Sequence, residues 1–128
     1  MRILLVDNDI NTVETLKFAI ATKGGYKVDV AYGGKEALDK MKKNELYNLL
    51  ILDIMMPEIN GIDVCKLMMQ DGELKNIPVL LISALPITSR AFQESLEKFQ
   101  ELKVIKDVIE KPFSIDELLI KVNKILPQ

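Results

Sequence analysis

Five short apolar runs alternate with five stretches of helical spacing along the 128 residues, and this order constrains the fold more than any other feature of the chain. The runs are Ile3–Val6, Val28–Ala31, Leu49–Leu52, Val79–Ile82 and Val108–Ile109. Continuous apolar runs of this length are typical of strands buried on both faces, as in a parallel sheet. Strict alternation of strand and helix therefore predicts one α/β domain, with helices covering both faces of a parallel sheet.

Helical spacing follows each of these runs. The first helix is predicted to stop at Gly24-Gly25, and Ser114 with Glu117 has the spacing of a capping box that opens the last helix. The apolar residues of the predicted helices are Val13, Leu16 and Ile20; Ala37, Leu38 and Met41, ending near Asn44; Ile62, Cys65 and Met69; Phe92, Leu96, Phe99 and Leu102, over about 88–102; and Ile115, Leu118, Leu119, Val122, Ile125 and Leu126.

Composition excludes several classes of function. The chain has no histidine, so Ser-His-Asp and Cys-His catalysis, imidazole zinc sites and a phosphohistidine of its own are excluded. A single cysteine cannot form an internal disulfide, and a net charge of −2 argues against direct nucleic-acid binding. No stretch approaches the roughly 18 consecutive apolar residues of a membrane span. We expect a soluble, cytoplasmic protein without membrane insertion.

The sulfur-containing side chains are predicted to pack in the core. Cys65 falls within the apolar spacing of the third helix, where a packed thiol is expected rather than a reactive one. Met55, Met56, Met68 and Met69 are likewise predicted to be packing residues and not a binding surface.

Polar side chains follow four of the five predicted strands. They are Asp7-Asn8-Asp9, Asp53, Ser83-Ala84 and Lys111-Pro112. In an open parallel sheet, ligands bind outside the carboxyl ends of the strands, so these side chains are predicted to converge at one edge. Clustered oxygen ligands suit magnesium, and a carboxylate beside such a cation can accept a phosphoryl group. The alternative is that Asp and Ser at these positions simply begin loops.

The ordered set of motifs resembles a response-regulator receiver domain. The matching segments are Asp7-Asn8, Asp53-Ile54-Met55-Met56-Pro57 followed by Gly61, Ser83-Ala84, and Lys111-Pro112-Phe113. The resemblance covers the whole chain and implies a flavodoxin-like, doubly wound (βα)5 sandwich whose five-stranded parallel sheet has the order 2-1-3-4-5. It also implies a single receiver domain over residues 1–128, with no output domain.

The resemblance implies a role in a two-component or phosphorelay system. Asp53 is expected to be the phosphoacceptor, and a sensor histidine kinase or a histidine phosphotransfer protein is the expected donor. A downstream protein of unknown identity would read the signal through protein–protein contacts. Any activity is expected to be autophosphorylation and autodephosphorylation at Asp53 rather than conventional turnover.

The resemblance also implies a magnesium (Mg2+) site. Asp7, Asn8 and Asp53 are the expected side-chain ligands, and the main-chain carbonyl of Met55 is expected to add another. The family usually has a second acid where this chain has Asn8, and a neutral amide holds a divalent cation less tightly. Asp9 either compensates for the missing acid or caps the first helix, and we favour the cap.

The remaining roles concern the phosphoryl group. Ser83 resembles the hydroxyl that turns toward it, and the backbone amides of Ala84 and Met55 resemble its neighbouring contacts. Lys111 resembles the lysine that pairs with the phosphoryl oxygens. The Lys111–Pro112 bond is expected to be cis, and Pro57 with Gly61 is expected to shape the turn after Asp53.

Two further departures from the family lie near the last strand. The position three before Lys111 often holds an aromatic residue that couples to the hydroxyl, and here it is Val108. Ser83 and Lys111 are 28 positions apart, more than a helical turn longer than usual, and Val104-Ile105 replaces the usual Gly-Ala. The fourth helix and its connection are therefore expected to be lengthened or re-routed, either for an unusual partner or as a harmless extension.

Two other functions stay open on the sequence alone. The first is a receiver-fold binding module with little or no phosphorylation, which Asn8 and Val108 favour. The second is a small haloacid dehalogenase-type phosphatase, with Asp7 as the nucleophile and Asp9 as the general acid. Those enzymes usually continue D-x-D-G-[TV], whereas this chain continues Asp9-Ile10-Asn11.

Overall fold

The computed structural model describes residues 1–43, 47–86, 88–99 and 102–126, and it omits the side chains of 95–99. The strands in these ranges are Arg2–Val6 (β1), Lys27–Ala31 (β2), Leu49–Asp53 (β3), Val79–Ser83 (β4) and Ile105–Glu110 (β5). They form one sheet in the order β2-β1-β3-β4-β5, and each pair of neighbours is parallel. The predicted doubly wound (βα)5 fold and its strand order are confirmed.

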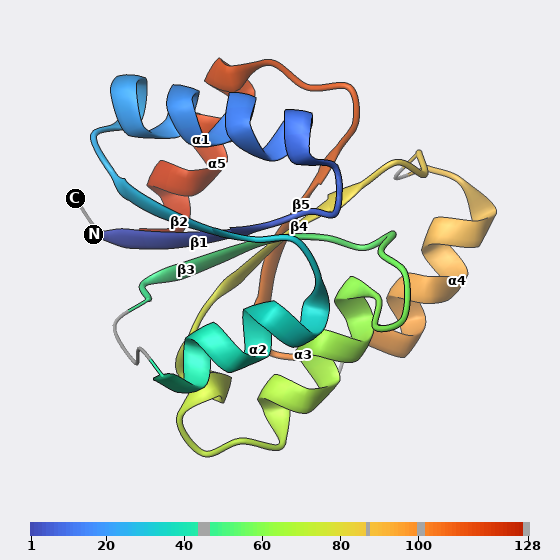
Figure 1. Ribbon diagram of the computed structural model, residues 1–128. Helices are drawn as coiled ribbons and strands as arrows, with labels where there is room; N and C mark the ends of the chain where they lie inside the picture. Colours follow the sequence, from blue (N-terminus) through green and yellow to red (C-terminus); the bar gives the residue numbers. More distant parts are fainter. Residues whose placement is uncertain (44–46, 87, 100–101, 127–128) are drawn as a thin grey trace.

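The helices cover both faces of this sheet. They are Ile10–Gly24 (α1), Gly34–Lys43 (α2), Gly61–Met69 (α3), Arg90–Phe99 (α4) and Ile115–Ile125 (α5), with a 3-10 turn at Leu74–Asn76 (η1). Figure 1 shows α1 and α5 on one face and α2 with α3 on the other. Because all five strands are parallel, their carboxyl ends lie at one edge of the sheet.

The fourth helix is shorter than the 88–102 that the spacing predicts. α4 begins at Arg90 because the Ser89 hydroxyl accepts a hydrogen bond from the Phe92 N–H, as a helix-capping residue does. Leu102 lies outside the helix, where its carbonyl accepts a turn hydrogen bond from the Ile105 N–H. The predicted packing of Leu96 and Phe99 concerns side chains outside the described part of the chain.

Two apolar layers hold the helices to the sheet. Alternate strand residues face opposite sides, so Leu4, Leu50 and Leu81 pack with α2 and α3, whereas neighbours such as Leu5 and Ile51 pack with α1 and α5. All of these side chains are buried, as expected for strands covered on both faces.

The predicted core sulfur residues divide into two groups. Cys65, Met56 and Met68 are buried, and Met69 packs against the same layer, as predicted. The prediction is wrong for Met55, which is 63% exposed because it lies in the loop beyond the end of β3.

Capping residues explain where several helices begin and end. The Asp9 carboxylate accepts hydrogen bonds from the Asn11 and Thr12 N–H groups at the start of α1, and Gly25 with φ 72° ends that helix. The Ser114 side chain accepts from the Glu117 N–H, which forms the predicted serine half of the box at α5. A complete capping box, which the sequence analysis did not predict, joins Asn60 and Asp63 at the start of α3.

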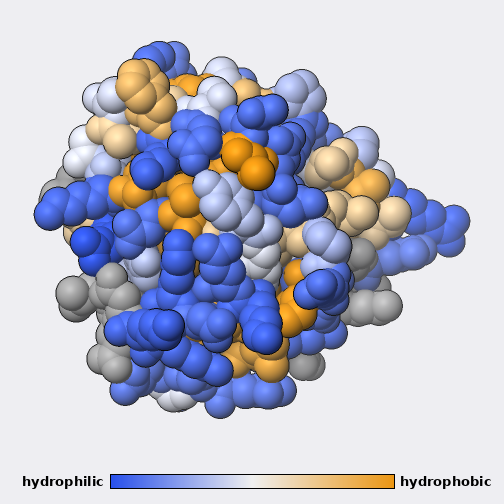
Figure 2. Space-filling model, in the orientation of Figure 1, coloured by the Kyte–Doolittle hydropathy of each residue, from blue (hydrophilic) through white to orange (hydrophobic). Residues whose placement is uncertain are grey.

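The face in Figure 2 carries mostly hydrophilic side chains, with small separate groups of apolar ones between them. Among the helices of the described residues, none combines the length and the apolar composition that a bilayer span requires.

Candidate functional site

Asp53 is the last residue of β3 and lies at the carboxyl edge of the sheet, with only 4% of its surface exposed. The Ile54 N–H after it donates to the Ile82 carbonyl, which continues the pairing with β4. Asp53 Oδ1 accepts a hydrogen bond from the Met55 N–H at 3.1 Å, and Oδ2 accepts one from Lys111 Nζ at 3.3 Å. Each oxygen therefore has a defined donor, and the carboxylate is held in one orientation.

Asp7 follows β1 and lies beside Asp53 on the neighbouring strand. Its N–H donates to the Ala31 carbonyl, and its Oδ1 accepts from the Asp9 N–H at 3.0 Å. Asp7 Oδ2 is 3.6 Å from Lys111 Nζ and has no hydrogen-bond partner among the described residues, although it is fully buried. A buried carboxylate oxygen in this state lacks the ligand that such a group normally requires.

Lys111 follows β5 and brings a positive charge to the two carboxylates. Its N–H donates to the Ser83 carbonyl at 2.8 Å, and its bond to Pro112 is cis, as the resemblance implies. The side chain is one-third exposed, and its amine lies within salt-bridge distance of both Asp53 and Asp7. One amine thus lies between carboxylates that two different strands supply.

Burial raises the pKa of the Asp53 carboxyl above its ordinary value, and the negative charge of Asp7 raises this pKa further. The Lys111 amine and the Met55 N–H act in the opposite direction, because both stabilise the ionised form. The site therefore holds two neighbouring carboxylates with less positive charge than would neutralise them.

Ser83 ends β4, with 1% of its surface exposed, and Ala84 lies exposed after it. The Ser83 hydroxyl donates to the Leu85 carbonyl at 2.9 Å and accepts from the Leu85 N–H at 3.1 Å. This hydroxyl is therefore turned toward its own loop. The strand end brings Ser83 to the same edge of the sheet as Asp53, as predicted.

The donor set at this edge fits a hard divalent cation. Asp7 Oδ2, which accepts no hydrogen bond from the described residues, and the Asp53 carboxylate are oxygen donors of the kind that Mg2+ prefers. In the residues described, no three His, Cys, Asp or Glu side chains come together as a metal cluster. Asn8 is exposed directly after Asp7, and Met55 is exposed two positions after Asp53.

Asp9 caps α1, which is the role that we favour on the sequence. Its Oδ2 accepts from the Thr12 hydroxyl at 3.0 Å, and its Oδ1 accepts from the backbone at the start of the helix. These hydrogen bonds lower the pKa of the Asp9 carboxyl, which holds it in the ionised form. An ionised capping carboxylate is not a general acid, so the geometry gives the haloacid dehalogenase-type hypothesis no support.

The loop after Asp53 depends on Gly61, as predicted. A Cβ at this position would lie 2.5 Å from the Asp53 carbonyl oxygen and 2.9 Å from Ile54 Cα, and both are backbone atoms that cannot easily move. The Gly61 N–H donates to the Ile54 carbonyl at 2.9 Å, which closes the loop. Glu58 in the same loop has φ 66°, a left-handed conformation that no sequence pattern indicated.

The sequence matches the profile of a known protein family. The profile of the family described as "Response regulator receiver domain" matches residues 3–123. The chain belongs to this family. The receiver domain is the domain type of response regulators in two-component signalling.

Several relatives resemble this receiver domain over nearly its whole length. It is 35% identical over 98% of its length to the "Transcriptional regulatory protein CpxR homolog" of Haemophilus influenzae, of which it covers 50%. It is 34% identical over 98% of its length to "Response regulator MprA" of Mycobacterium avium, of which it covers 51%. The chain thus spans about half the length of these curated relatives.

Solved structures show the same fold. The chemotaxis protein CheY4 of Vibrio cholerae is 26% identical, with a TM-score of 0.84 over 98% of both chains. The receiver domain of the Francisella response regulator 1452 is 34% identical, with a TM-score of 0.80 over 97% of this chain and 94% of that one.

The departures near the last strand have a structural basis in this receiver domain. Val108 is partly buried against the layer formed with α2 and α3. Val104 is buried, and its carbonyl accepts from the Val79 N–H at 2.8 Å, which brings the segment before β5 into the sheet.

Proposed function

We propose that this receiver domain accepts a phosphoryl group on Asp53 from a phosphohistidine of a partner kinase or phosphotransfer protein. The observation that carries the proposal is the position of the Lys111 amine within 3.3 Å of Asp53 and 3.6 Å of Asp7. The donor is external because the chain has no histidine. Because the chain belongs to the receiver family, we place this reaction in cytoplasmic two-component signalling.

In the proposed transfer, a carboxylate oxygen of Asp53 forms a bond to phosphorus as the phosphorus–nitrogen bond of the phosphohistidine breaks. The electron pair of that bond remains on the imidazole nitrogen, and the product on this chain is an acyl phosphate. The Met55 N–H and Lys111 hold the carboxylate in position before the reaction. Lys111 then pairs with the phosphoryl oxygens, because these replace the carboxylate charge that it contacts in the resting site.

Asp7 and Asp53 would hold Mg2+ together with the side-chain oxygen of Asn8 and the carbonyl of Met55. When bound, Mg2+ supplies positive charge that offsets the charge on the transferring oxygens. Asp7 Oδ2 supports this assignment, because this buried oxygen accepts no hydrogen bond from the described residues and lies 3.6 Å from the Lys111 amine.

Ser83 and Ala84 are proposed to contact the phosphoryl group after transfer. The Ser83 hydroxyl would exchange its hydrogen bond with Leu85 for one with a phosphoryl oxygen, which requires only rotation of one side-chain bond. The exposed Ala84 backbone amide would add a second donor. This exchange changes the loop after β4, and a downstream protein would recognise that change.

Mass spectrometry tests the proposal. After incubation with acetyl phosphate and magnesium chloride, the intact protein should gain the mass of one phosphoryl group. Asp53→Asn should abolish this gain, whereas Asp39→Asn, which changes an exposed aspartate on α2, should leave it unchanged. Phosphoryl uptake that persists in Asp53→Asn would show that another residue is the acceptor.

A second candidate function is a receiver-fold binding module with weak or no phosphorylation. Asn8 favours it, because the site then offers two carboxylates where a third acid is usual. A magnesium titration separates the two functions. Sub-millimolar binding would contradict the binding-module hypothesis, and absent binding together with absent uptake of a phosphoryl group would support it.

A further inference from the structure

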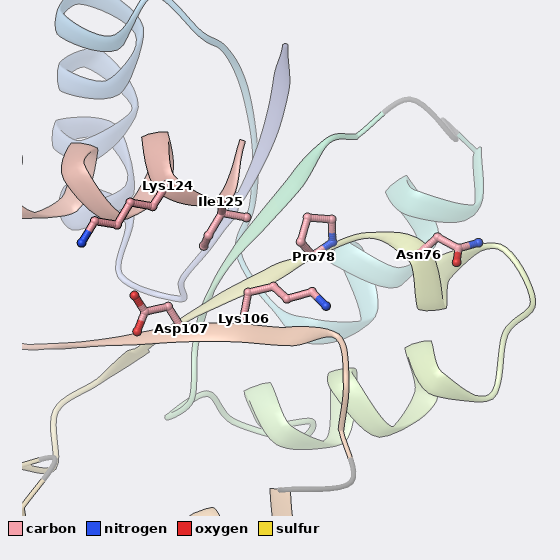
Figure 3. Close-up of a pocket in the computed structure, with 6 residues that line it drawn as sticks. All are labelled: Asn76, Pro78, Lys106, Asp107, Lys124 and Ile125. Atoms are coloured by element: carbon pink, nitrogen blue, oxygen red, sulfur yellow. The ribbon is translucent and has the colours of Figure 1, made fainter. Parts of the chain in front are cut away.

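A cavity of ≈ 490 Å³ lies at the end of the sheet opposite to Asp53 (Figure 3). It is lined by Asn76, Pro78, Lys106, Asp107, Lys124 and Ile125. Pro78 precedes β4, and Lys106 is the second residue of β5, whereas Ser83 and Lys111 mark the far ends of these strands. The cavity is therefore separate from the phosphoacceptor site, and the sequence analysis did not predict it.

A β-bulge shapes one wall of this cavity. Val79 pairs with Ile105 and Leu80 pairs with Asp107, so Lys106 is the extra residue on the edge strand β5. Successive side chains of a regular strand point to opposite faces, but the bulge lets both Lys106 and Asp107 line the cavity. A bulge and a lysine also keep an edge strand from pairing with other chains, so this feature alone requires no ligand.

The charge of the cavity indicates one class of ligand. Asp107 is already engaged, since its Oδ2 lies 2.9 Å from Lys121 Nζ and its Oδ1 accepts from the Val108 N–H. Lys106 and Lys124 are exposed, and within the described ranges neither makes an ion pair. Two exposed lysines from different elements, neither of them in an ion pair within the described ranges, thus line one hollow of a chain whose net charge is −2.

The two amines do not point to the same place. Figure 3 shows the Lys106 side chain directed toward Pro78 and the Lys124 amine at the other end of the group, with Ile125 between them. The two lysine side chains therefore extend in opposite directions from the hollow. An extended ligand with two separated acidic groups and an apolar part between them would match both lysines and Ile125.

We propose that this cavity binds an acidic peptide segment of a partner protein, in which two carboxylate side chains flank an apolar one. Sites for small organic ligands are mostly lined by apolar side chains, whereas four of the six lining residues here are polar or charged. Such a segment would be repelled by Asp7, Asp9 and Asp53 at the opposite end of the sheet, so the charge distribution directs it to the cavity.

Binding is measured by NMR titration of the 15N-labelled chain with a synthetic hexapeptide. In this peptide, two glutamates precede and two glutamates follow a central pair of leucines. Saturable chemical-shift changes are expected at the amides of Asn76, Lys106 and Lys124. The double substitution Lys106→Gln, Lys124→Gln should weaken binding about fivefold or more, the effect of losing two exposed charge pairs. The matched control Lys17→Gln, Lys23→Gln removes two exposed lysines from α1 and should leave the affinity unchanged.

Three results would overturn the proposal. One is equal weakening in the α1 control, which would indicate general charge attraction. Another is equal binding of a hexapeptide with glutamine in place of glutamate. The third is occupation of the cavity by pyrophosphate or by phosphatidylserine vesicles without any binding of the acidic hexapeptide. The titration is repeated on Asp53→Asn, where the same affinity is expected, so its outcome does not depend on phosphorylation.

Discussion

The amine of Lys111 lies 3.3 Å from the carboxylate of Asp53, although the two residues are 58 positions apart in the chain. The contact exists because β3 and β5 flank β4, so residues at their carboxyl ends meet at one edge of the sheet. A change at Asp7 or at Lys111 therefore alters the pKa of Asp53.

Replacing Lys111 with methionine should lower the free energy of unfolding at about pH 7 by about 1–2 kcal/mol, because two neighbouring carboxylates lose their shared positive charge. The Lys111 amine lowers the pKa of Asp53, so its removal raises this pKa further above the unfolded value. The destabilisation is complete above the pKa of Asp53 in the folded variant, and it disappears as the pH falls below the pKa of Asp53 in the folded unchanged protein. Urea unfolding at about pH 7 and pH 4 measures it.

Lys111→Arg is the control for this experiment, because it keeps the charge and should retain most of the stability. An equal loss of stability at both pH values in Lys111→Met would contradict the electrostatic explanation and would indicate lost packing instead.

Asp53→Asn should raise the melting temperature by a few degrees in the presence of a metal chelator. Burial and the charge of Asp7 raise the pKa of Asp53, so its ionised form destabilises the folded protein at neutral pH. The gain should vanish below about pH 4, where the carboxyl is protonated in both states. A lower melting temperature than that of the unchanged protein at neutral pH would show that the Asp53 charge is stabilising.

Asn8→Asp should tighten Mg2+ binding about tenfold, because ligand charge controls affinity at oxygen sites. Calorimetric titration measures the affinity directly, and a larger magnesium-dependent rise of the melting temperature provides an independent readout. Asn11→Asp adds the same charge at an exposed position in the first turn of α1, so it is the matched control. Equal effects of the two substitutions would mean that position 8 is not a ligand.

Gly61→Ala should destabilise the protein by about 1–3 kcal/mol, because the new Cβ overlaps the backbone at Asp53 and Ile54. It should also slow phosphoryl uptake from acetyl phosphate, since the Asp53 main chain has to move. Gly72→Ala is the control, because a Cβ there meets no atom within 4 Å, and a gain of up to about 1 kcal/mol is expected. Chemical denaturation that gives equal values for both would exclude the steric explanation.

The thiol of Cys65 should react with a disulfide reagent only as the protein unfolds. The side chain is completely buried in α3, and burial raises the pKa of the thiol to about 12. Spectrophotometric labelling in native buffer should therefore be slow and should accelerate with urea in parallel with unfolding. Rapid labelling in native buffer would show that the α3 layer opens without global unfolding.

Local patterns in the sequence were sufficient for the first four strands and most of the helices, whereas the run Val108–Ile109 marked only part of β5, which spans Ile105–Glu110. Apolar runs such as Leu49–Leu52 predict buried strands, because only a strand covered on both faces has no polar side. The stop at Gly24-Gly25 and the capping role of Asp9 were also readable, since capping depends on residues within one turn of the helix. The end of α4 could not be predicted in this way. Leu102 continues the helical spacing of apolar residues, but it lies in a turn before β5.

The positions of Asp7, Asp53, Ser83 and Lys111 at the strand ends follow from the sequence alone, because the carboxyl ends of parallel strands share one edge. Their distances and orientations do not. Only the tertiary structure decided that one amine contacts both carboxylates, that the Ser83 hydroxyl faces Leu85 and that Met55 is exposed. The β-bulge at Lys106 is also a feature that only the tertiary structure decided. Register and side-chain rotamers depend on contacts between residues far apart in the chain, and no local pattern encodes those contacts.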